Sequence, residues 1–289
     1  MKTFGQLWHS YNIKNMKLNR LVSYLFILVV FICISLGIAY LAKQNKNTSS
    51  VKNIILYPDI TKINKEKPVD VLFYFHGAGC TERLVLNPYT SGGLNLLDKK
   101  TKYRDDLIIV SLGFTESYHC SSPETVTATI KTIKHIISQY NTRKIYLFGN
   151  SMGGSLALNV LSLIDKNIQT KISAVAAVMP VINYEYMLQF SKHENICKPI
   201  KDHFYKFHDP IKQMKKSSPI NYIDKLPSDT RIILVEGIND TYVGSAQIEK
   251  YYKFARRKNN HVELYKWNID HSFVDVAEEF KGLIYSVID

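Results

Sequence analysis

The chain has 289 residues and a formal net charge of +12, with 46% hydrophobic and 12% aromatic residues, which excludes a disordered tail or a low-complexity fibre. Half of the positive excess lies in residues 1–50, so we expect no nucleic-acid partner, which would need basic residues spread over a folded domain. That segment has no acidic residue, and its basic residues are Lys2, Lys14, Lys17, Arg20, Lys43 and Lys46.

These basic residues bracket a hydrophobic run. Residues 21–42 are 22 consecutive uncharged residues, enough for a helix to cross a bilayer. A cleaved signal peptide with an apolar region at 21–36 is the alternative. That apolar region and the basic segment before it, 1–20, are both longer than is usual for a signal peptide. We predict a basic tail at 1–20, a single-pass transmembrane anchor at 21–42 and a polar linker at 43–53. The slight excess of Lys and Arg before the anchor favours an inside N-terminus and an outside domain.

The remaining chain, 54–289, alternates apolar runs with helical patterns. Several runs, such as VLFYF and IILV, are nearly continuous, which is typical of strands covered on both faces. The predicted strands are Ile54–Tyr57, Val69–Phe75, Leu107–Val110, Lys144–Phe148, Ile172–Val178, Arg231–Glu236 and Val262–Trp267.

Helical stretches separate these strands. The best-marked one begins at Ser121, because Ser121 and Glu124 have capping-box spacing and Pro123 suits a first turn, and it extends to about Tyr140. The alternation predicts an α/β fold with a mostly parallel, doubly wound sheet. The other predicted helices are Met152–Ile164, Ser245–Arg257 and Val274–Ile288.

Residues 183–226 interrupt this rhythm. The segment is too long for a bare connection between two strands, so we predict an inserted helical cap. Its aromatic side chains suit either an apolar substrate pocket or packing of the cap on the body. These aromatic residues are Tyr184, Tyr186, Phe190, Phe204, Tyr205 and Phe207.

The sequence Gly149-Asn150-Ser151-Met152-Gly153 directly follows a predicted strand and directly precedes a predicted helix. A nucleophilic serine on a sharp strand-to-helix turn needs small neighbours, because larger side chains would collide there. The amide N–H of Met152, at the helix N-terminus, would face a developing oxyanion. We therefore predict that Ser151 is a nucleophile and that Met152 forms part of an oxyanion hole.

The loop His76-Gly77-Ala78-Gly79-Cys80 follows another predicted strand. Its small residues allow a backbone N–H, that of Ala78, to point toward the same oxyanion. His76 precedes the serine in the chain, and we interpret it as a residue that packs in the loop.

Asp240 and His271 each follow a predicted strand, at the edge where open α/β sheets build their sites. A serine nucleophile needs a base, and that base needs a carboxylate to orient it. The chain order of Ser151, Asp240 and His271 is the one expected for such a fold. Asp270 and Glu236 are weaker candidates for the carboxylate.

No metal-ligand spacing is apparent. His203 and His208 lie near Asp202 and Asp209, but this spacing matches no metal motif, and we interpret the group as part of a solvated cap. The remaining histidines, including His119 and His193, do not follow a predicted strand. Cys80 and Cys120 follow neighbouring sheet-edge loops. They could therefore form a disulfide or remain two free thiols, and the sequence favours neither.

The segments FYFHGAG, YLFGNSMGGSLAL, Ser218–Pro227, RIILVEGINDTYV and DHSF together resemble the α/β-hydrolase superfamily, in its serine esterase and prolyl-oligopeptidase-like branch. The resemblance covers residues 69–289. It implies hydrolysis of an ester or peptide through an acyl-Ser151 intermediate, with no metal or organic cofactor. We therefore expect a membrane-anchored serine hydrolase acting on a small-molecule ester or peptide, with an acyltransferase or a non-catalytic binding protein as alternatives.

Overall fold

The computed structural model describes residues 51–57, 63–86, 104, 106–271 and 277–288. The predicted tail, the predicted anchor at 21–42 and the first eight residues of the predicted linker lie outside the described residues. In the part of the chain that the structure describes, no helix is both long enough and apolar enough to cross a bilayer.

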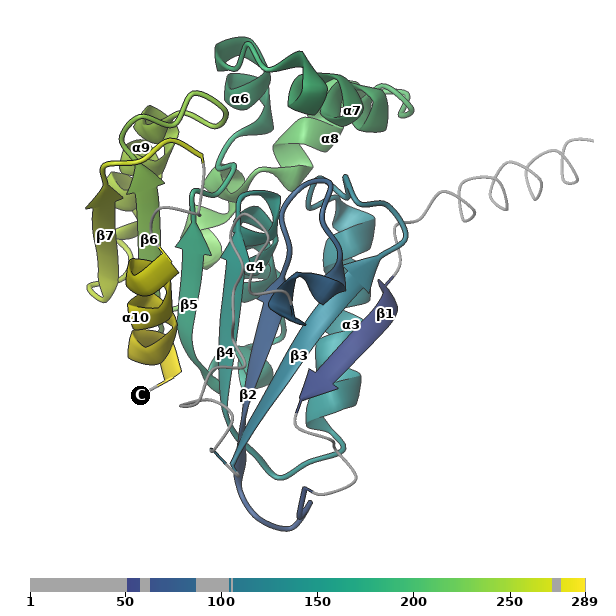
Figure 1. The fold of residues 1–289 in the computed structure, drawn as a ribbon, viewed down its shortest axis with the longest axis vertical. Coiled ribbons are helices and arrows are strands. Elements are labelled where there is room, and N and C mark those ends of the chain that lie inside the picture. The colour runs from purple at the N-terminus through teal and green to yellow at the C-terminus, as the bar shows by residue number, and fades with distance from the viewer. Residues whose placement is uncertain (1–50, 58–62, 87–103, 105, 272–276, 289) are drawn as a thin grey trace, which may run out of the picture. The chain divides into compact units, whose positions relative to one another are not determined.

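The described strands form one seven-stranded sheet in the order β1-β3-β2-β4-β5-β6-β7 (Figure 1). β1 runs antiparallel to β3, and every other neighbouring pair is parallel, so the prediction of a mostly parallel sheet is confirmed. The strands are β1 (Val51–Tyr57), β2 (Val69–Phe75), β3 (Leu107–Phe114), β4 (Thr142–Asn150), β5 (Ile172–Val178), β6 (Arg231–Gly237) and β7 (Val262–Trp267).

Helices connect and cover these strands. α3, α4 and α9 lie on one face of the sheet and α10 lies on the other (Figure 1). The helices are η2 (Glu82–Leu86), α3 (Pro123–Ile137), α4 (Met152–Leu163), α5 (Lys166–Gln169), α6 (Tyr184–Phe190), α7 (Glu194–Phe204), α8 (Pro210–Ser217), η3 (Pro219–Lys225), α9 (Ser245–Ala255) and α10 (Ala277–Ile288).

The continuous apolar runs of the strands follow from this two-sided cover. Along β2, Val71 and Phe73 join the core under α3 and α4, whereas Leu72 and Tyr74 join the core under α10. Side chains of a strand point alternately to the two faces, so a strand covered on both faces favours apolar residues at successive positions. The wholly buried β2 therefore lacks the alternating pattern of a half-exposed strand.

Several element boundaries differ from the sequence-based expectation, and two of these differences have a clear physical cause. β1 begins at Val51, inside the predicted linker, because Val51 and the residues after it pair with β3. The N-cap of α3 is Ser122, whose Oγ accepts from the Thr125 N–H at 3.3 Å, so the predicted capping box of Ser121 and Glu124 is wrong. Ser121 instead has a left-handed backbone, with φ of 48°, and its hydroxyl donates to the Met152 carbonyl at 3.1 Å.

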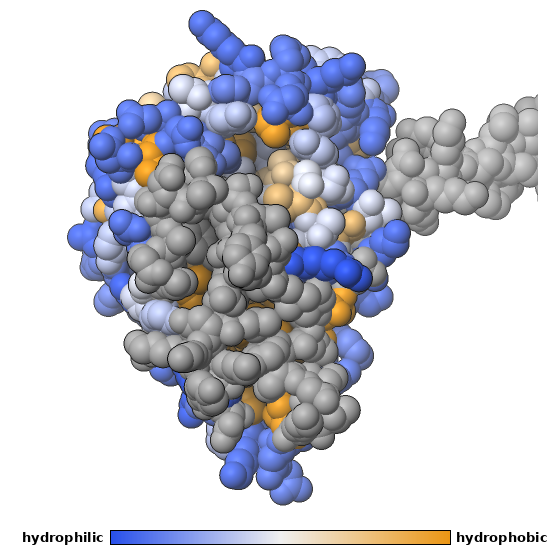
Figure 2. All heavy atoms as spheres, in the orientation of Figure 1, coloured by the Kyte–Doolittle hydropathy of each residue, from blue (hydrophilic) through white to orange (hydrophobic). Residues whose placement is uncertain are grey.

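The predicted cap segment is helical in the structure. It forms α6, α7, α8 and η3 between β5 and β6, and it extends beyond the carboxyl ends of the strands (Figure 1). The surface over these helices is mostly hydrophilic (Figure 2). Beneath it, Tyr184, Phe204, Met187 and Ile200 form an apolar cluster that also contains Met152, so the cap packs directly on the residue after Ser151.

The opposite, amino-terminal edge of the sheet is held by an ion cluster. The buried carboxylate of Asp70 on β2 accepts from Arg104 at 2.9 Å and from Arg143 on β4 at 2.8 Å. Both guanidinium groups also bind Asp106, and the pKa of Asp106 is lowered, chiefly by its hydrogen bond with Arg104. The cluster joins β2, β4 and the start of β3.

We expect Asp70→Asn to lower the free energy of unfolding by about 1–3 kcal/mol, because two partly exposed guanidinium groups lose their buried counter-charge. Asp224→Asn is the matched control, since Asp224 is 87% exposed and pairs only at the surface with Lys258. Its expected effect is about 0.5 kcal/mol or less. Urea denaturation of the three proteins measures both values, and an equal loss in the two variants would contradict a structural role for the Asp70 cluster.

Candidate active site

Ser151 lies in the turn between the end of β4 and the start of α4. Its φ and ψ are 52° and −122°, a strained backbone for a residue with a side chain. The turn is tight enough that a Cβ on Gly149 would collide with the Gly153 carbonyl, and a Cβ on Gly153 would collide with the carbonyl of Phe75. The two glycines of the G-x-S-x-G motif are therefore required by close backbone contacts.

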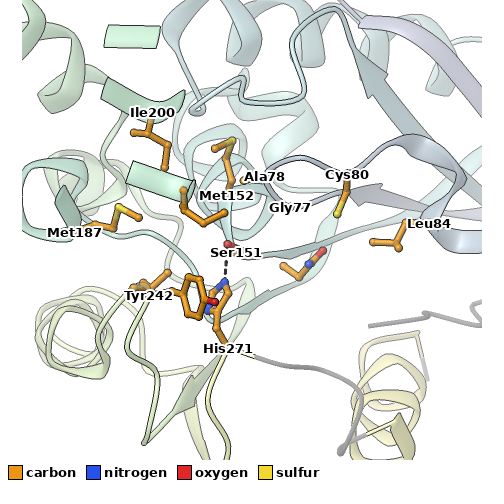
Figure 3. A pocket seen from close by; sticks show the side chains of 13 residues that line it. Gly77, Ala78, Cys80, Leu84, Ser151, Met152, Met187, Ile200, Tyr242 and His271 are labelled. Carbon is orange, nitrogen blue, oxygen red and sulfur yellow. Dashed lines mark hydrogen bonds between the residues drawn. The ribbon is translucent and has the colours of Figure 1, made fainter. Parts of the chain in front are cut away.

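Three side chains from different strand ends meet at this turn. His271 Nε2 lies 2.9 Å from Ser151 Oγ, and His271 Nδ1 lies 2.7 Å from Asp240 Oδ2 (Figure 3 draws the first contact). Asp240 follows β6 and His271 follows β7, as the sequence predicts. With Asp240 ionised, Nδ1 donates to the carboxylate and Nε2 is left to accept the serine hydroxyl proton.

Asp240 is held by more than the imidazole. Its side chain is fully buried, and its Oδ1 accepts from the backbone N–H groups of Tyr242 and Val243, each at 2.9 Å. Burial raises the pKa of this carboxyl, but the hydrogen bond and charge of His271 and the two backbone donors outweigh burial, so the pKa is lowered overall. Asp240 is thus an ionised carboxylate with a fixed orientation.

The loop after β2 lies against the same turn. A Cβ built on Gly77 would lie 3.5 Å from the Ser151 Cβ and 3.1 Å from the Asn150 Nδ2, so the loop passes close to the serine. Ala78 and Met152 both line the pocket beside Ser151 (Figure 3). Met152 is the first residue of α4, and its N–H has no acceptor within the helix. Both residues predicted to form the oxyanion hole therefore adjoin the serine.

A pocket of about 160 Å³ opens above Ser151. On one side the cap contributes Met187, Ile196 and Ile200, and on the other side lie Cys80 and Leu84 (Figure 3 labels all but Ile196). The sequence left either a pocket role or a packing role open for the six cap aromatics, and none of them is among the described residues that line this pocket. Two of the six, Tyr184 and Phe204, are instead buried in the cap interior.

The competing candidates lie elsewhere. The loop histidine, His76, is 1% exposed, its Nδ1 contacts the Gly77 carbonyl at 2.8 Å, and its ring packs on Phe114. Burial lowers the pKa of His76, as expected for a neutral packing residue. Glu236 pairs with Lys266, and Asp270 is exposed, whereas Asp240 contacts His271.

His203, considered as a metal ligand from the sequence, contacts Glu116 instead, with 2.9 Å between Nδ1 and Oε2. In the described ranges, no group of three or more His, Cys, Asp or Glu side chains is arranged to hold a metal ion. Cys80 and Cys120 are both free thiols, so the disulfide alternative is not present in this structure. The Cys120 thiol is buried and donates to the Tyr118 carbonyl at 3.3 Å.

Two residues near His271 are missing from the sequence-based set. The ring of Tyr242 stacks on the His271 imidazole, with 5.4 Å between centroids, and the ring of His193 stacks on Tyr242 at 3.6 Å. Tyr242 is two residues from Asp240, so its place in the sequence close to a candidate catalytic residue could have indicated that it lies near the site. His193 comes from the cap, and no local pattern in the sequence connects it to this site.

A sequence profile of the Prolyl oligopeptidase family matches residues 123–277, more than half of the chain, including Ser151, Asp240 and His271. The chain belongs to the prolyl oligopeptidase family. It is accordingly a serine hydrolase with an α/β-hydrolase-like fold. No curated protein matches the chain as a relative in sequence.

Solved structures of other hydrolases share the fold of this prolyl oligopeptidase family member. An esterase of Pyrococcus furiosus has a TM-score of 0.56 and 16% identity, with 76% of this chain and 81% of that chain covered. A fluorophosphonate-binding serine hydrolase of Staphylococcus aureus has a TM-score of 0.60 and 13% identity over 82% and 91%. An acylaminoacyl peptidase of Pyrococcus horikoshii has a TM-score of 0.57 and 15% identity over 85% of this chain and 42% of that chain.

The lowered pKa of Asp240 predicts a pH-dependent contribution to stability. A carboxyl whose folded-state pKa lies below its unfolded value of about 4 stabilises the protein above that value. The contribution is lost as the pH falls through the lower, folded-state pKa. We expect the difference in unfolding free energy between the parent and Asp240→Asn to be larger at pH 6 than at pH 3. Denaturant titrations at both pH values test this, and a difference that grows toward pH 3 would contradict it.

Proposed function

We propose that this serine hydrolase cleaves an ester, or the related amide bond of a peptide, through an acyl intermediate on Ser151. The observation that carries the proposal is the hydrogen-bonded chain from Asp240 through His271 to Ser151, with distances of 2.7 and 2.9 Å. A serine hydroxyl becomes a nucleophile when an oriented base takes its proton.

In the first half-reaction, His271 Nε2 takes the hydroxyl proton as Ser151 Oγ forms a bond to the substrate carbonyl carbon. The carbonyl electron pair moves to oxygen, giving a tetrahedral oxyanion. When this intermediate collapses, the bond to the leaving group breaks, and His271 gives its proton to that group. Asp240 stays ionised and stabilises the imidazolium. The acyl group remains on Ser151.

In the second half-reaction, water takes the place of the leaving group. His271 accepts a proton from the water as its oxygen attacks the acyl carbon, and then returns a proton to Ser151 Oγ as the acid departs. The N–H groups of Met152 and Ala78 are proposed to donate to the oxyanion in both halves. Donors held in place by the backbone stabilise this charge without reorganisation during the reaction.

We expect Ser151→Ala and His271→Ala each to lower kcat/KM for p-nitrophenyl acetate by on the order of 10⁴-fold. Ser151→Ala should also abolish labelling by a fluorophosphonate probe. Ser162→Ala is the control, because Ser162 is a buried serine of α4, the helix that follows Ser151, and its hydroxyl donates within that helix to the Leu158 carbonyl. It should retain parental activity and labelling. Hydrolysis by Ser151→Ala at the parental rate would refute the mechanism.

The same variants separate hydrolysis from the alternatives. A non-catalytic binding protein would show no labelling in the parent. An acyltransferase would label on Ser151 but would form a new ester in preference to free acid when an alcohol is added, because the alcohol and water compete for the same acyl-serine. Product analysis with and without butanol therefore distinguishes the two enzyme classes.

We also propose that the hydrolase is anchored in a membrane by residues 21–42, with its N-terminus inside and the hydrolase domain outside. The support is the uncharged run of 22 residues and the basic residues around it. The protein should remain in the membrane pellet after alkaline carbonate extraction and should keep its N-terminal residues when its intact mass is measured. Protease added to intact cells should degrade the domain. A soluble form lacking residues 1–39, cut after Ala39, would instead indicate signal-peptide cleavage.

A further inference from the structure

The ring of Tyr242 stacks with two histidines from different parts of the fold. Its centroid lies 5.4 Å from that of His271, with 28° between the planes. It lies 3.6 Å from that of His193, with 5° between the planes. His193 comes from the cap, directly before α7, whereas Tyr242 and His271 follow β6 and β7. Tyr242 thus connects the cap to the proposed base through two stacked pairs of rings.

Further contacts fix these rings in place. His193 Nε2 lies 2.9 Å from Thr241 Oγ1. The cap is therefore hydrogen-bonded to Thr241 and also stacked on the ring of Tyr242. The backbone N–H of Tyr242 donates to Asp240 Oδ1 at 2.9 Å. Its backbone therefore orients the carboxylate, while its ring covers one side of the imidazole that this carboxylate holds. In Figure 3 the Tyr242 ring lies beside His271 and below Ser151.

Two hydrogen bonds, one at each ring nitrogen, still allow an imidazole to rock about the axis that joins its two partners. A flat ring packed beside the imidazole restricts this rotation and resists tilting of Nε2 away from Ser151. The aromatic face also attracts a cation, so it favours the imidazolium that forms only during the reaction. Both effects act on His271 and require no contact between Tyr242 and the reacting bond.

We propose that Tyr242 is a positioning residue, which holds the imidazole of His271 in line with Ser151 and is itself braced by His193 of the cap. The inference rests on the proposed function, because it assigns His271 as the base. It makes the cap a part of the catalytic support as well as a wall of the pocket. The geometry also assigns the work to the aromatic ring of Tyr242 and not to its hydroxyl.

The test compares Tyr242→Phe, Tyr242→Ala and His193→Ala in the full-length protein with p-nitrophenyl acetate, whose two-carbon acyl group is small. Tyr242→Phe keeps the ring and should retain kcat within about twofold. Tyr242→Ala should lower kcat roughly 10- to 100-fold with little change in KM, because small displacements of a catalytic group carry large costs in rate. His193→Ala should give a smaller fall in kcat, and His193→Phe, which restores a flat ring, should recover part of it.

Tyr186 provides the matched control. It is a cap tyrosine whose ring also stacks on another aromatic ring, that of Phe190, at 5.8 Å and 9°, and it does not line the pocket above Ser151. Tyr186→Ala should keep the parental kcat. A melting curve of each variant shows whether it is folded at the assay temperature. The far-downfield proton resonance of the His271 Nδ1–H···Asp240 hydrogen bond gives a second readout, which should broaden in Tyr242→Ala and persist in Tyr242→Phe and Tyr186→Ala.

Three outcomes would overturn the inference. A rise in KM at unchanged kcat in Tyr242→Ala would make Tyr242 only a pocket wall. An equal loss in Tyr242→Phe and Tyr242→Ala would assign the effect to the hydroxyl. An unchanged proton resonance in Tyr242→Ala would show that the ring does not hold the imidazole. Fluorophosphonate labelling separates this failure from failure of the proposed function. An unlabelled parent would remove the function itself, whereas a labelled Tyr242→Ala with the parental kcat would remove only the inference.

Discussion

The close approach of Gly153 to the end of β2 is the contact on which the candidate site depends. A Cβ at Gly153 would overlap the carbonyl of Phe75, so the first turn of α4 is pressed against the strand that leads into the Gly77 loop. This one contact fixes the positions of two residues at once. It places Ser151 at the end of β4, and it places Ala78, from a loop about 70 residues earlier in the chain, beside the same serine. A side chain at Gly153 would push apart the proposed nucleophile, Ser151, and the proposed oxyanion donors.

The parallel sheet supplies the other two residues by a more general rule. The carboxyl ends of parallel strands lie along one edge, so residues that follow β4, β6 and β7 are brought to the same side of the sheet regardless of their separation in sequence. Asp240 follows the strand that neighbours β7, and His271 bridges back to β4. At the opposite, amino-terminal edge, the ion pairs of Asp70 with Arg104 and Arg143 join the strands. Chemistry and anchoring of the strands are thus divided between opposite edges of one sheet.

Much of this could be predicted from sequence because the signals are local. Continuous apolar runs marked the strands, and Gly149, Ser151 and Gly153 marked a turn whose geometry admits few residue types. The helix start at Ser122 could not be predicted in the same way. Ser121 offered better capping-box spacing, but its hydroxyl is engaged by the Met152 carbonyl, a contact across 31 residues. The pocket lining was missed for a similar reason, since which cap residues face inward depends on how α6 and α7 pack, and Met187 and Ile200 carry no signal that separates them from core residues.

The position of His193 shows why a cap on this fold affects more than access. A cap that only covered the pocket could vary freely wherever it does not contact substrate. Here the cap also contacts Thr241 and Tyr242, the two residues directly after Asp240. A shift of α7 would therefore disturb both catalytic candidates through Tyr242. It would affect the buried carboxylate through the backbone N–H of Tyr242, and the imidazole through the ring of Tyr242. The lowered pKa of Asp240 depends in part on those backbone donors. Changes in the cap that alter substrate choice are thus constrained to preserve these ring contacts, because the segment that contributes to the pocket also contacts the residues that orient the proposed catalytic pair.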